Sequence, residues 1–199
     1  AGSISGPIIK DRLQVRVAYA HRQQDGFIRN TIVNADANPF KADSVAASIR
    51  AEPADDVVLT VNGYYDIVLG GAVPYAFMSG PTDYKRIIQL NYDNYQRFKY
   101  KRVNAKLEFP LGVADPTVSL IGAYDERNVR TVAGDLDFTA VDIARNTGTD
   151  TLRTRTAELR FDSKLSSSVS SIFGLFYSRE TRDGDTTTTL FPGVLNIVN

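Results

Sequence analysis

The sequence lacks most of the residues on which common catalytic and metal sites depend. Its 199 residues include no cysteine and a single histidine, His21. Without cysteine there is no disulfide, no thiolate zinc site and no thiol nucleophile. One histidine excludes a His-rich metal centre and leaves little basis for a Ser-His-Asp enzyme. We therefore predict that the protein is not an enzyme, holds no metal ion and needs no cofactor.

The chain also lacks an excess of charge and a long apolar run. Its 23 basic side chains are balanced by 23 acidic ones, whereas nucleic-acid binders carry a basic excess that neutralises phosphates. We therefore expect no nucleic-acid partner. The longest largely apolar run, at 67–78, is broken by two glycines and a proline, and a transmembrane helix needs about 18 apolar residues. A transmembrane β-barrel is still allowed, because its alternating strands keep the mean hydropathy ordinary.

Alternation of apolar and polar residues is what the sequence has in quantity. No segment has the periodicity of an amphipathic helix. A partial strand is expected at 3–9, before the strands given next. A period of two is typical of strands with one apolar and one polar face, and it occurs at 13–20, 44–50, 59–66, 102–109, 118–125, 156–162 and 169–177. The pattern predicts an all-β protein of about eight meandering antiparallel strands.

The connections between these strands alternate in length. Turn-forming residues indicate short connections at 10–11, 53–56, 111–116 and 166–168. Long segments lie between them, at 30–42, 70–97, 130–152 and 182–199. Outer-membrane barrels have short periplasmic turns and long extracellular loops, whereas such long loops are uncommon in compact soluble domains. The alternation therefore predicts an antiparallel transmembrane β-barrel segment in a bacterial outer membrane.

Aromatic residues recur where the edges of a membrane are expected. Four tyrosines lie eight or nine residues beyond a short turn, on the apolar side of their strand: Tyr19, Tyr65, Tyr124 and Tyr177. Nine residues at ~3.3 Å and a tilt of ~40° span a height of ~23 Å, close to the ~25 Å apolar band of an outer-membrane barrel. We predict that these tyrosines form an interface girdle against outer-membrane lipid. Phe109 and Phe161 precede short turns and are candidates for the opposite girdle.

The polar side of the strands carries charges of both signs in nearly equal number. Unpaired charge is costly in a low-dielectric setting, so this balance predicts a paired, hydrated wall that faces a lumen or a plug. The residues assigned to this wall are Arg16, Arg50, Arg102, Lys106, Glu108, Glu158 and Arg160.

Two of the long segments contain candidate site residues. Segment 70–97 combines aromatic with basic side chains, which suit a siderophore or a sugar; alternatively, they fold the loop or anchor it at the headgroups. The candidate ligand-binding residues are Tyr75, Phe77, Tyr84, Arg86, Tyr92 and Tyr95. Segment 130–152 has four aspartates, but without the spacing of a calcium loop, so we expect no metal site there.

Several short motifs, in their order and spacing, resemble those of TonB-dependent outer-membrane receptors. Residues 3–13 (SISGPIIKDRL) resemble the hairpin that follows the first barrel strand. Residues 24–30 (QDGFIRN) resemble the Asp-Gly-Tyr-x-x-Asn motif where the second strand leaves the membrane. Residues 157–161 (AELRF) resemble a later strand, and residues 174–185 (GLFYSRETRDGD) resemble a strand that opens into an extracellular loop. The resemblance covers nearly the whole chain.

The resemblance implies that residues 1–199 are an early part of a receptor barrel. Such barrels have 22 strands, and neither the remaining strands nor the N-terminal plug is expected within this chain. The implied activity is energy-coupled import of a scarce nutrient, such as an iron–siderophore complex, haem, cobalamin or an oligosaccharide. The implied partners are outer-membrane lipid, the receptor's own plug, the TonB energy-coupling complex and a small-molecule or metal-chelate substrate.

Two other classes of protein stay open on the sequence alone. A complete eight-stranded outer-membrane barrel, acting as a structural protein or an adhesin, fits the chain length and the balanced interior charge. Such a closed barrel would pair its first and last strands, yet the strand at 3–9 is short and 18 residues follow Thr181. A soluble β-rich carbohydrate-binding module would instead be a monomer without detergent.

Overall fold

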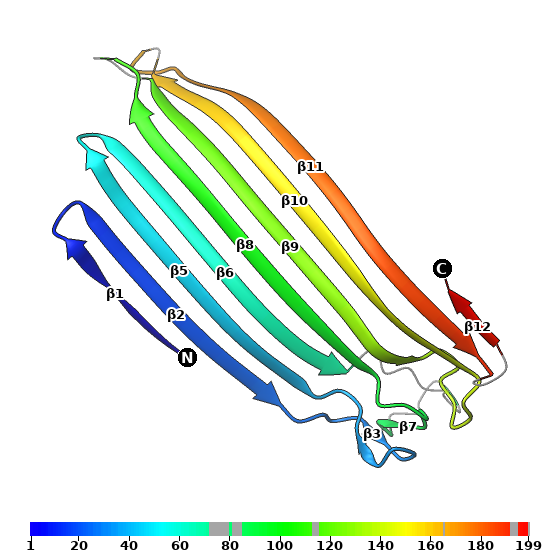
Figure 1. Ribbon diagram of the computed structural model, residues 1–199. Coiled ribbons are helices and arrows are strands. Elements are labelled where there is room, and N and C mark those ends of the chain that lie inside the picture. Colours follow the sequence, from blue (N-terminus) through cyan, green and yellow to red (C-terminus); the bar gives the residue numbers. More distant parts are fainter. Residues whose placement is uncertain (72–79, 81–84, 113–115, 165, 192–194, 199) are drawn as a thin grey trace.

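One antiparallel sheet of nine strands dominates the computed structural model, which describes residues 1–71, 80, 85–112, 116–164, 166–191 and 195–198 (Figure 1). The strands follow the order of the sequence across the sheet. They are β1 (Gly2–Ile9), β2 (Leu13–Gln24), β5 (Phe40–Ala54), β6 (Val57–Gly71), β8 (Tyr95–Pro110), β9 (Thr117–Asp135), β10 (Ala144–Lys164), β11 (Ser170–Leu190) and β12 (Leu195–Val198). The prediction of an all-β antiparallel meander is confirmed.

The sheet is open in the structure. β1 pairs only with β2, and β12 pairs only with the last residues of β11, from Thr187 to Leu190. A closed barrel of this chain alone would pair β1 with β11, and the two lie at opposite edges of the sheet (Figure 1). The described residues contain no helix with the length and apolar character needed to cross a membrane.

The short connections are found where the sequence predicts them. β1 and β2 are joined at 10–12, and β5 and β6 at 55–56. Asp11 and Asp56 have φ angles of 57° and 60°, a region that aspartate tolerates better than most residues. All of these turns lie at one end of the sheet, called here the turn end, and the long connections lie at the other, the loop end (Figure 1).

Three of the four long connections are shorter than predicted, because the strands continue into them, whereas the connection from β2 to β5, at 25–39, is not shorter. β5 already begins at Phe40, β8 at Tyr95 and β10 at Ala144, whereas β9 ends at Asp135 and β11 at Leu190. The extensions of β10 and β11 are largely polar on both faces, and so they carry no apolar alternation. Their backbones nevertheless pair on both sides in β10, whose residues 148–152 are opposite both β9 and β11. Backbone pairing, rather than side-chain pattern, decides where these strands end.

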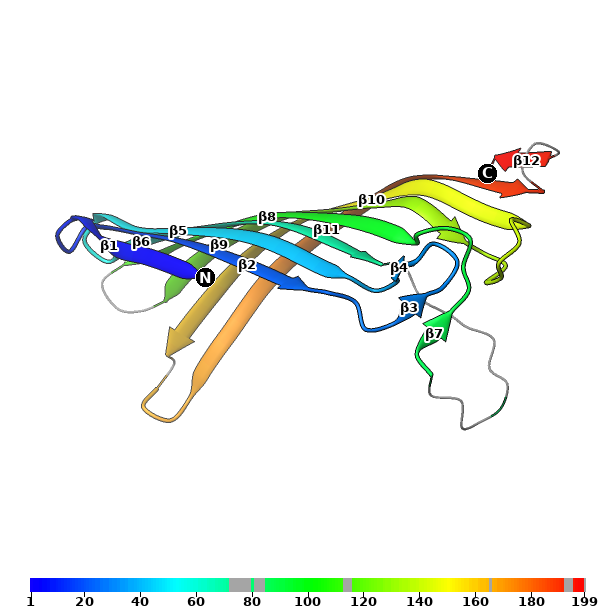
Figure 2. The ribbon, with the colours of Figure 1, turned by 90° about the horizontal axis from the view of Figure 1, so that it is seen from below.

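A second, small sheet forms at the loop end and was not predicted. It contains β3 (Arg29–Asn30), β4 (Ala35–Asp36) and β7 (Ile87–Ile88), in the order β4-β3-β7. β3 and β7 are parallel, so the segment after β2 lies against the segment before β8. Figure 2 shows this small sheet beneath the loop end of the large one.

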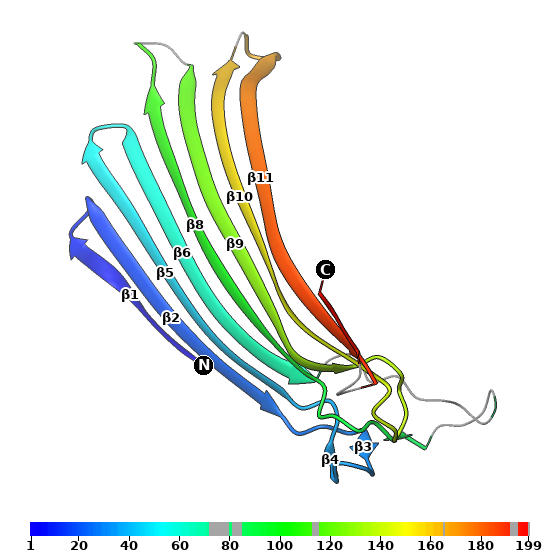
Figure 3. The ribbon, with the colours of Figure 1, turned by 45° about the vertical axis from the view of Figure 1, so that its right-hand side comes forward.

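The large sheet has almost no hydrophobic core. It is a single curved layer (Figures 2 and 3), and the only buried apolar side chains among the described residues are Ala37, Ala42, Ile88, Leu90 and Val118. Large apolar side chains in the middle of the strands are exposed instead, with Val17 at 48% and Leu175 at 61%. A sheet that exposes this much apolar surface requires a partner that covers it.

Candidate functional site

The register between strands collects the apolar residues of seven strands on one face, called here the apolar face. The clearest row runs straight across the sheet from β2 to β11, with each residue directly opposite the next. Because side chains alternate between faces, a row of opposite residues shares one face. The row consists of Leu13, Ala51, Leu59, Leu107, Leu120, Leu159 and Leu175.

The four tyrosines mark a line across this face that slopes from β6 to β11. Tyr19 and Tyr65 share one row, in which both are opposite Val45. Tyr124 lies two residues nearer the turn end, and Tyr177 a further two. Three of them, Tyr65, Tyr124 and Tyr177, define the slope: four residues, ~13 Å, over the four strand spacings from β6 to β11, ~19 Å, give about 35°. Tyr19 lies in the row of Tyr65 and does not continue this slope. Strands of outer-membrane barrels tilt by ~35–45°, so a plane across such tilted strands would contain this line.

Polar residues begin just beyond the tyrosines and follow the same slope. The first polar residues of the apolar face form directly opposed pairs on neighbouring strands. The tyrosine hydroxyls turn toward them: Tyr19 donates to Asp43 at 2.7 Å, and Tyr124 donates to Glu126 at 2.8 Å. The pairs are His21 and Asp43 on β2 and β5, Lys101 and Glu126 on β8 and β9, and Arg155 and Arg179 on β10 and β11.

The phenylalanines predicted for the opposite girdle bound the apolar face at the turn end. Phe109 and Phe161 are both opposite Val118, one row beyond the leucines. Phe161 also packs against Phe173, with ring centroids 6.4 Å apart. Both predicted residues therefore lie on the apolar face, at the edge where the turns begin. Their contact with a membrane interface stays a prediction.

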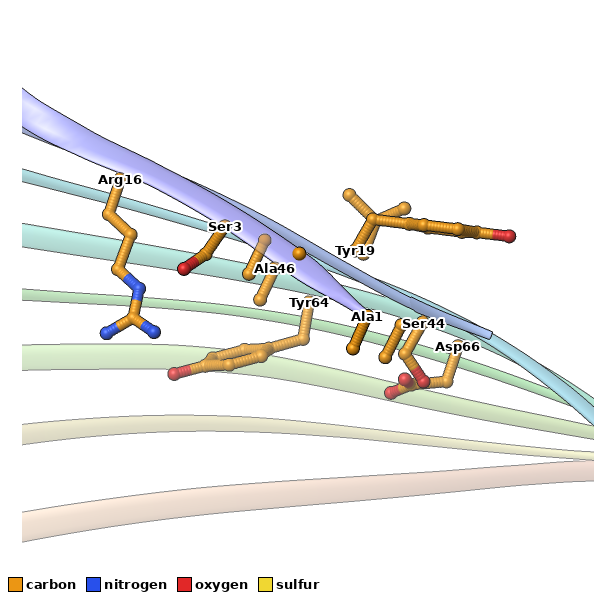
Figure 4. A pocket seen from close by; sticks show the side chains of 12 residues that line it. Ala1, Ser3, Arg16, Tyr19, Ser44, Ala46, Tyr64 and Asp66 are labelled. Atoms are coloured by element: carbon orange, nitrogen blue, oxygen red, sulfur yellow. The ribbon is translucent and has the colours of Figure 1, made fainter. Parts of the chain in front are cut away.

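The other face of the sheet carries the residues predicted to line a lumen. Figure 4 shows Arg16, Tyr64 and Asp66 on one side of the sheet and Tyr19 on the other. A ladder of side-chain hydrogen bonds crosses this polar face, from Ser48 to Asn62 at 2.8 Å and from Asn62 to Asn104 at 2.9 Å.

Most charges of the polar face are paired, as predicted. Lys106 lies 2.6 Å from Glu108, and Arg160 lies 3.0 Å from Asp162. Arg102 contacts Asp125, and Arg50 contacts Glu52. Glu158 is opposite Ile121 and Phe176, and Arg16 lines a shallow hollow with Tyr64 and Asp66 (Figure 4); neither has an ion pair within the described ranges.

At the loop end, a small buried cluster ties two connections together. Ala37, Ile88 and Leu90 are buried there. Asn30, at the end of β3, is also buried and hydrogen-bonds both backbone groups of Leu90. Its Nδ2 donates to the Leu90 carbonyl at 2.8 Å, and its Oδ1 accepts from the Leu90 N–H at 3.3 Å. One amide side chain thus replaces strand pairing between residues 60 positions apart.

A second tie joins the connection before β8 to the one after β9. The Oδ1 of Asn94 accepts a 2.6 Å hydrogen bond from the Asp135 N–H, and both residues are buried. The Asp135 carboxylate accepts from the N–H groups of Phe138 at 2.7 Å and Asn91 at 3.2 Å. Burial raises the pKa of Asp135 above its usual value, although these donors oppose the shift.

Tyr92 forms a third tie at the loop end. Its hydroxyl donates to Asp142 and accepts from Arg145 at 2.7 Å, and the Arg145 guanidinium lies 5.2 Å from the Tyr92 ring centroid. The hydrogen bond to Asp142 is the main cause of the raised pKa of Tyr92. Ties of this kind hold the connections at the loop end in a defined arrangement.

The six predicted ligand-binding residues do not form one described group. Tyr75, Phe77 and Tyr84 lie outside the described residues. Arg86 lies over the Phe27 ring at 5.6 Å, and Tyr92 contacts Asp142 and Arg145. The prediction that Tyr95 lies in a loop is wrong: it is the first residue of β8, beside a hollow lined by Phe40 and Leu69. Ligand contact by these residues stays a prediction.

Sequence reasoning missed the asparagines and the aspartate that order the loop end. Asn30 ends the QDGFIRN motif, so the motif contained a signal for it. Asn94 and Asp135 have no such signal, because their partners lie 41 positions apart in the sequence. Nowhere in the described ranges do three or more His, Asp or Glu side chains form a group suited to a metal ion.

Comparison with known proteins supports the fold and little beyond it. No family model matches the chain, and no curated protein has a similar sequence. Among solved structures, it is similar to the crystal structure of the ferric yersiniabactin uptake receptor FyuA from Yersinia pestis, with a TM-score of 0.78 and 16% sequence identity. The similarity covers 95% of this chain and 29% of that receptor. The chain therefore has the fold of part of that receptor and spans less than a third of its length.

Proposed function

We propose that the chain forms part of the wall of a bacterial outer-membrane barrel that imports a nutrient, in the manner of TonB-dependent receptors. The observation that carries the proposal is the exposed apolar face with its sloping line of tyrosines. Transfer of one leucine-sized side chain from water to hydrocarbon is worth ~1.5–3 kcal/mol. The leucines of the row are partly exposed, with Leu120 at 43% and Leu175 at 61%, so each contributes a fraction of this value when lipid covers the face. Outer-membrane lipid is the proposed partner of this face.

The polar face is the proposed inner wall. Its ion pairs and amide ladder suit contact with water or with a folded plug, since most of its charged groups retain a partner when solvent is partly excluded. In the complete receptor, the plug would lie against this wall and transmit energy from the TonB complex.

The loop end is the proposed extracellular end, where substrate would first be met. Ordered loops with aromatic and cationic side chains suit a bulky, anionic metal chelate. The similar receptor takes up ferric yersiniabactin, which favours an iron–siderophore complex over haem, cobalamin or an oligosaccharide. Arg86 is the described side chain best placed to test this, because it is exposed and lies over Phe27.

The membrane proposal is tested with single cysteines, because the chain has none of its own. Leu120→Cys on the apolar face and Asn104→Cys on the polar face each receive a fluorescent probe, and the chain is reconstituted in phosphatidylcholine vesicles. Lipids brominated along their acyl chains should quench the probe at position 120 and spare the one at position 104. Equal quenching at both positions, or a soluble monomer without detergent, contradicts the proposal.

The substrate class is tested separately, on the chain held in detergent micelles. Arg86→Ala should lower the affinity for a ferric siderophore at least tenfold, since the cation is removed from an aromatic surface. Arg22→Ala, on the polar face of β2, is the matched control and should leave the affinity unchanged. Equal affinities for all three proteins would contradict a role for this loop in siderophore binding.

A further inference from the structure

The apolar face changes character abruptly beyond the tyrosine line. Within four register rows of that line it carries eight cations and four carboxylates, although the whole chain has no net charge. We call these residues the rim. The cations are Lys41, Arg97, Lys99, Lys101, Arg130, Arg153, Arg155 and Arg179, and the carboxylates are Asp43, Glu126, Asp183 and Asp185.

Two pairs of rim arginines are directly opposite each other on neighbouring strands. Arg97 is opposite Arg130 on β8 and β9, and Arg155 is opposite Arg179 on β10 and β11. Like charges in directly opposed positions destabilise a sheet. None of the four forms an ion pair within the part of the chain that the structure describes, and the Nε of Arg97 is buried without a hydrogen-bond partner.

Most carboxylates of the rim form hydrogen bonds or ion pairs with residues other than the four opposed arginines. Glu126 accepts from Lys101 at 2.9 Å, from Arg153 at 3.2 Å and from Tyr124. Asp183 accepts from Arg153 at 2.6 Å. Asp43 is shared by Tyr19 and His21. The two arginine pairs therefore lack the negative charge that would make their juxtaposition favourable.

The position of the Arg155–Arg179 pair restricts what can supply that charge. Arg155 lies one row beyond Ala157, which is opposite Tyr177, and its guanidinium is 5.9 Å from the Tyr124 ring centroid. The apolar band begins directly beneath it. A ligand here must present an anionic group next to hydrocarbon, and arginine pairs favour phosphate because each guanidinium donates two parallel hydrogen bonds.

We propose that the rim binds the phosphate groups of anionic lipids in the membrane leaflet at the loop end. Each lipid lays its acyl chains along the leucine rows and places its phosphate between Arg155 and Arg179. The inference rests on the proposed membrane location. It adds that the rim binds anionic lipids in preference to uncharged ones. Removal of one such cation lowers lipid affinity by about fivefold.

The test uses the whole chain in nonionic micelles, titrated with phosphatidylglycerol or phosphatidylcholine, with retained lipids counted by native mass spectrometry. The chain should retain phosphatidylglycerol preferentially. Arg155→Gln/Arg179→Gln should lower the affinity for phosphatidylglycerol at least tenfold, and Arg97→Gln/Arg130→Gln, farther from the apolar band, should lower it less. The matched control is Arg16→Gln/Arg22→Gln on the polar face, which removes the same charge and should retain the preference.

A second measurement separates binding from folding. Without anionic lipid, Arg155→Gln/Arg179→Gln should unfold at the same or a higher temperature than the original chain, because a repulsion has been removed. Addition of phosphatidylglycerol should then raise the unfolding temperature of the original chain and not that of the variant. Lower stability of the variant without lipid would overturn the proposal.

The remaining outcomes distinguish the sources of failure. If the polar-face control loses as much affinity for phosphatidylglycerol as the rim variant, the rim is not a specific site. General charge attraction then explains the binding. If inorganic phosphate at equal concentration displaces the lipid, the ligand of the rim is a free anion and the assignment of a lipid is overturned. Insertion into vesicles without a preference for phosphatidylglycerol overturns the rim alone, whereas failure of the probe at position 120 to enter lipid overturns the proposed function as well.

Discussion

The middle of the sheet and its loop end are built in opposite ways. In the middle, long strands pair regularly while large apolar side chains such as Val17 and Leu175 remain 48% and 61% exposed. At the loop end, the backbone is irregular, and polar residues such as Asn30 and Asp135 are buried. The middle satisfies its backbone internally and depends on its surroundings to cover the side chains. The loop end covers its own side chains and depends on amide and carboxylate groups to satisfy the backbone.

The largest effect should come from a charge in the middle of the apolar face. Leu120→Arg should destabilise the inserted chain by ~2–4 kcal/mol, because the guanidinium would lie at the depth of the hydrocarbon. Denaturant unfolding in phosphatidylcholine vesicles measures this. Ala46→Arg on the polar face introduces the same side chain and should cost less than ~1 kcal/mol; equal costs would mean that the two faces do not differ in their surroundings.

Removal of the Asn30 side chain should damage the loop end and leave the middle intact. Asn30→Ala leaves both backbone groups of the buried Leu90 without the partner described above, at a cost of ~1–3 kcal/mol. Amide hydrogen exchange should accelerate at Leu90 and stay slow at Leu120. Gln24→Ala, an exposed change nearby, is the control. Faster exchange throughout the sheet would show that the two regions unfold together.

The Tyr92 tie should contribute less, since it lies nearer the surface. Tyr92→Phe removes the donor to Asp142, whose Oδ1 is already buried without a partner, and should cost about 1–2 kcal/mol. Limited proteolysis of the loop end measures the change. Adding Asp142→Asn should recover part of the loss, because the charge left without its donor is then removed; a purely additive loss would argue against direct coupling.

The smallest effect is a pH dependence confined to the loop end. The raised pKa of Asp135 means that the folded loop end binds a proton more tightly than the unfolded chain does. Its stability should therefore fall as the pH rises from the usual aspartate pKa through the raised one, and change little above it. Asp135→Asn should abolish this dependence in hydrogen exchange at Phe138. An opposite slope would contradict the sign of the shift.

Prediction from sequence worked best where one strand suffices to make the pattern. Val15, Val17 and Tyr19 alternate within β2, and the same parity recurs in the other strands, so the two faces could be assigned without the structure. It failed where strands are polar on both faces, as at residues 144–152 of β10. It also placed Tyr95 in a loop, because the polar residues on both sides of it, from Asp93 to Arg97, give no alternation.

By itself, the sequence determined the all-β class, the alternation of short and long connections and the membership of each face. These follow from side-chain alternation, which is a local property of an extended chain. Only the tertiary structure decided the slope of the tyrosine line, the opposition of Arg155 to Arg179 and the tie from Asn30 to Leu90. Each depends on register between strands or on contact between distant segments, and register is set by pairing that no single strand encodes.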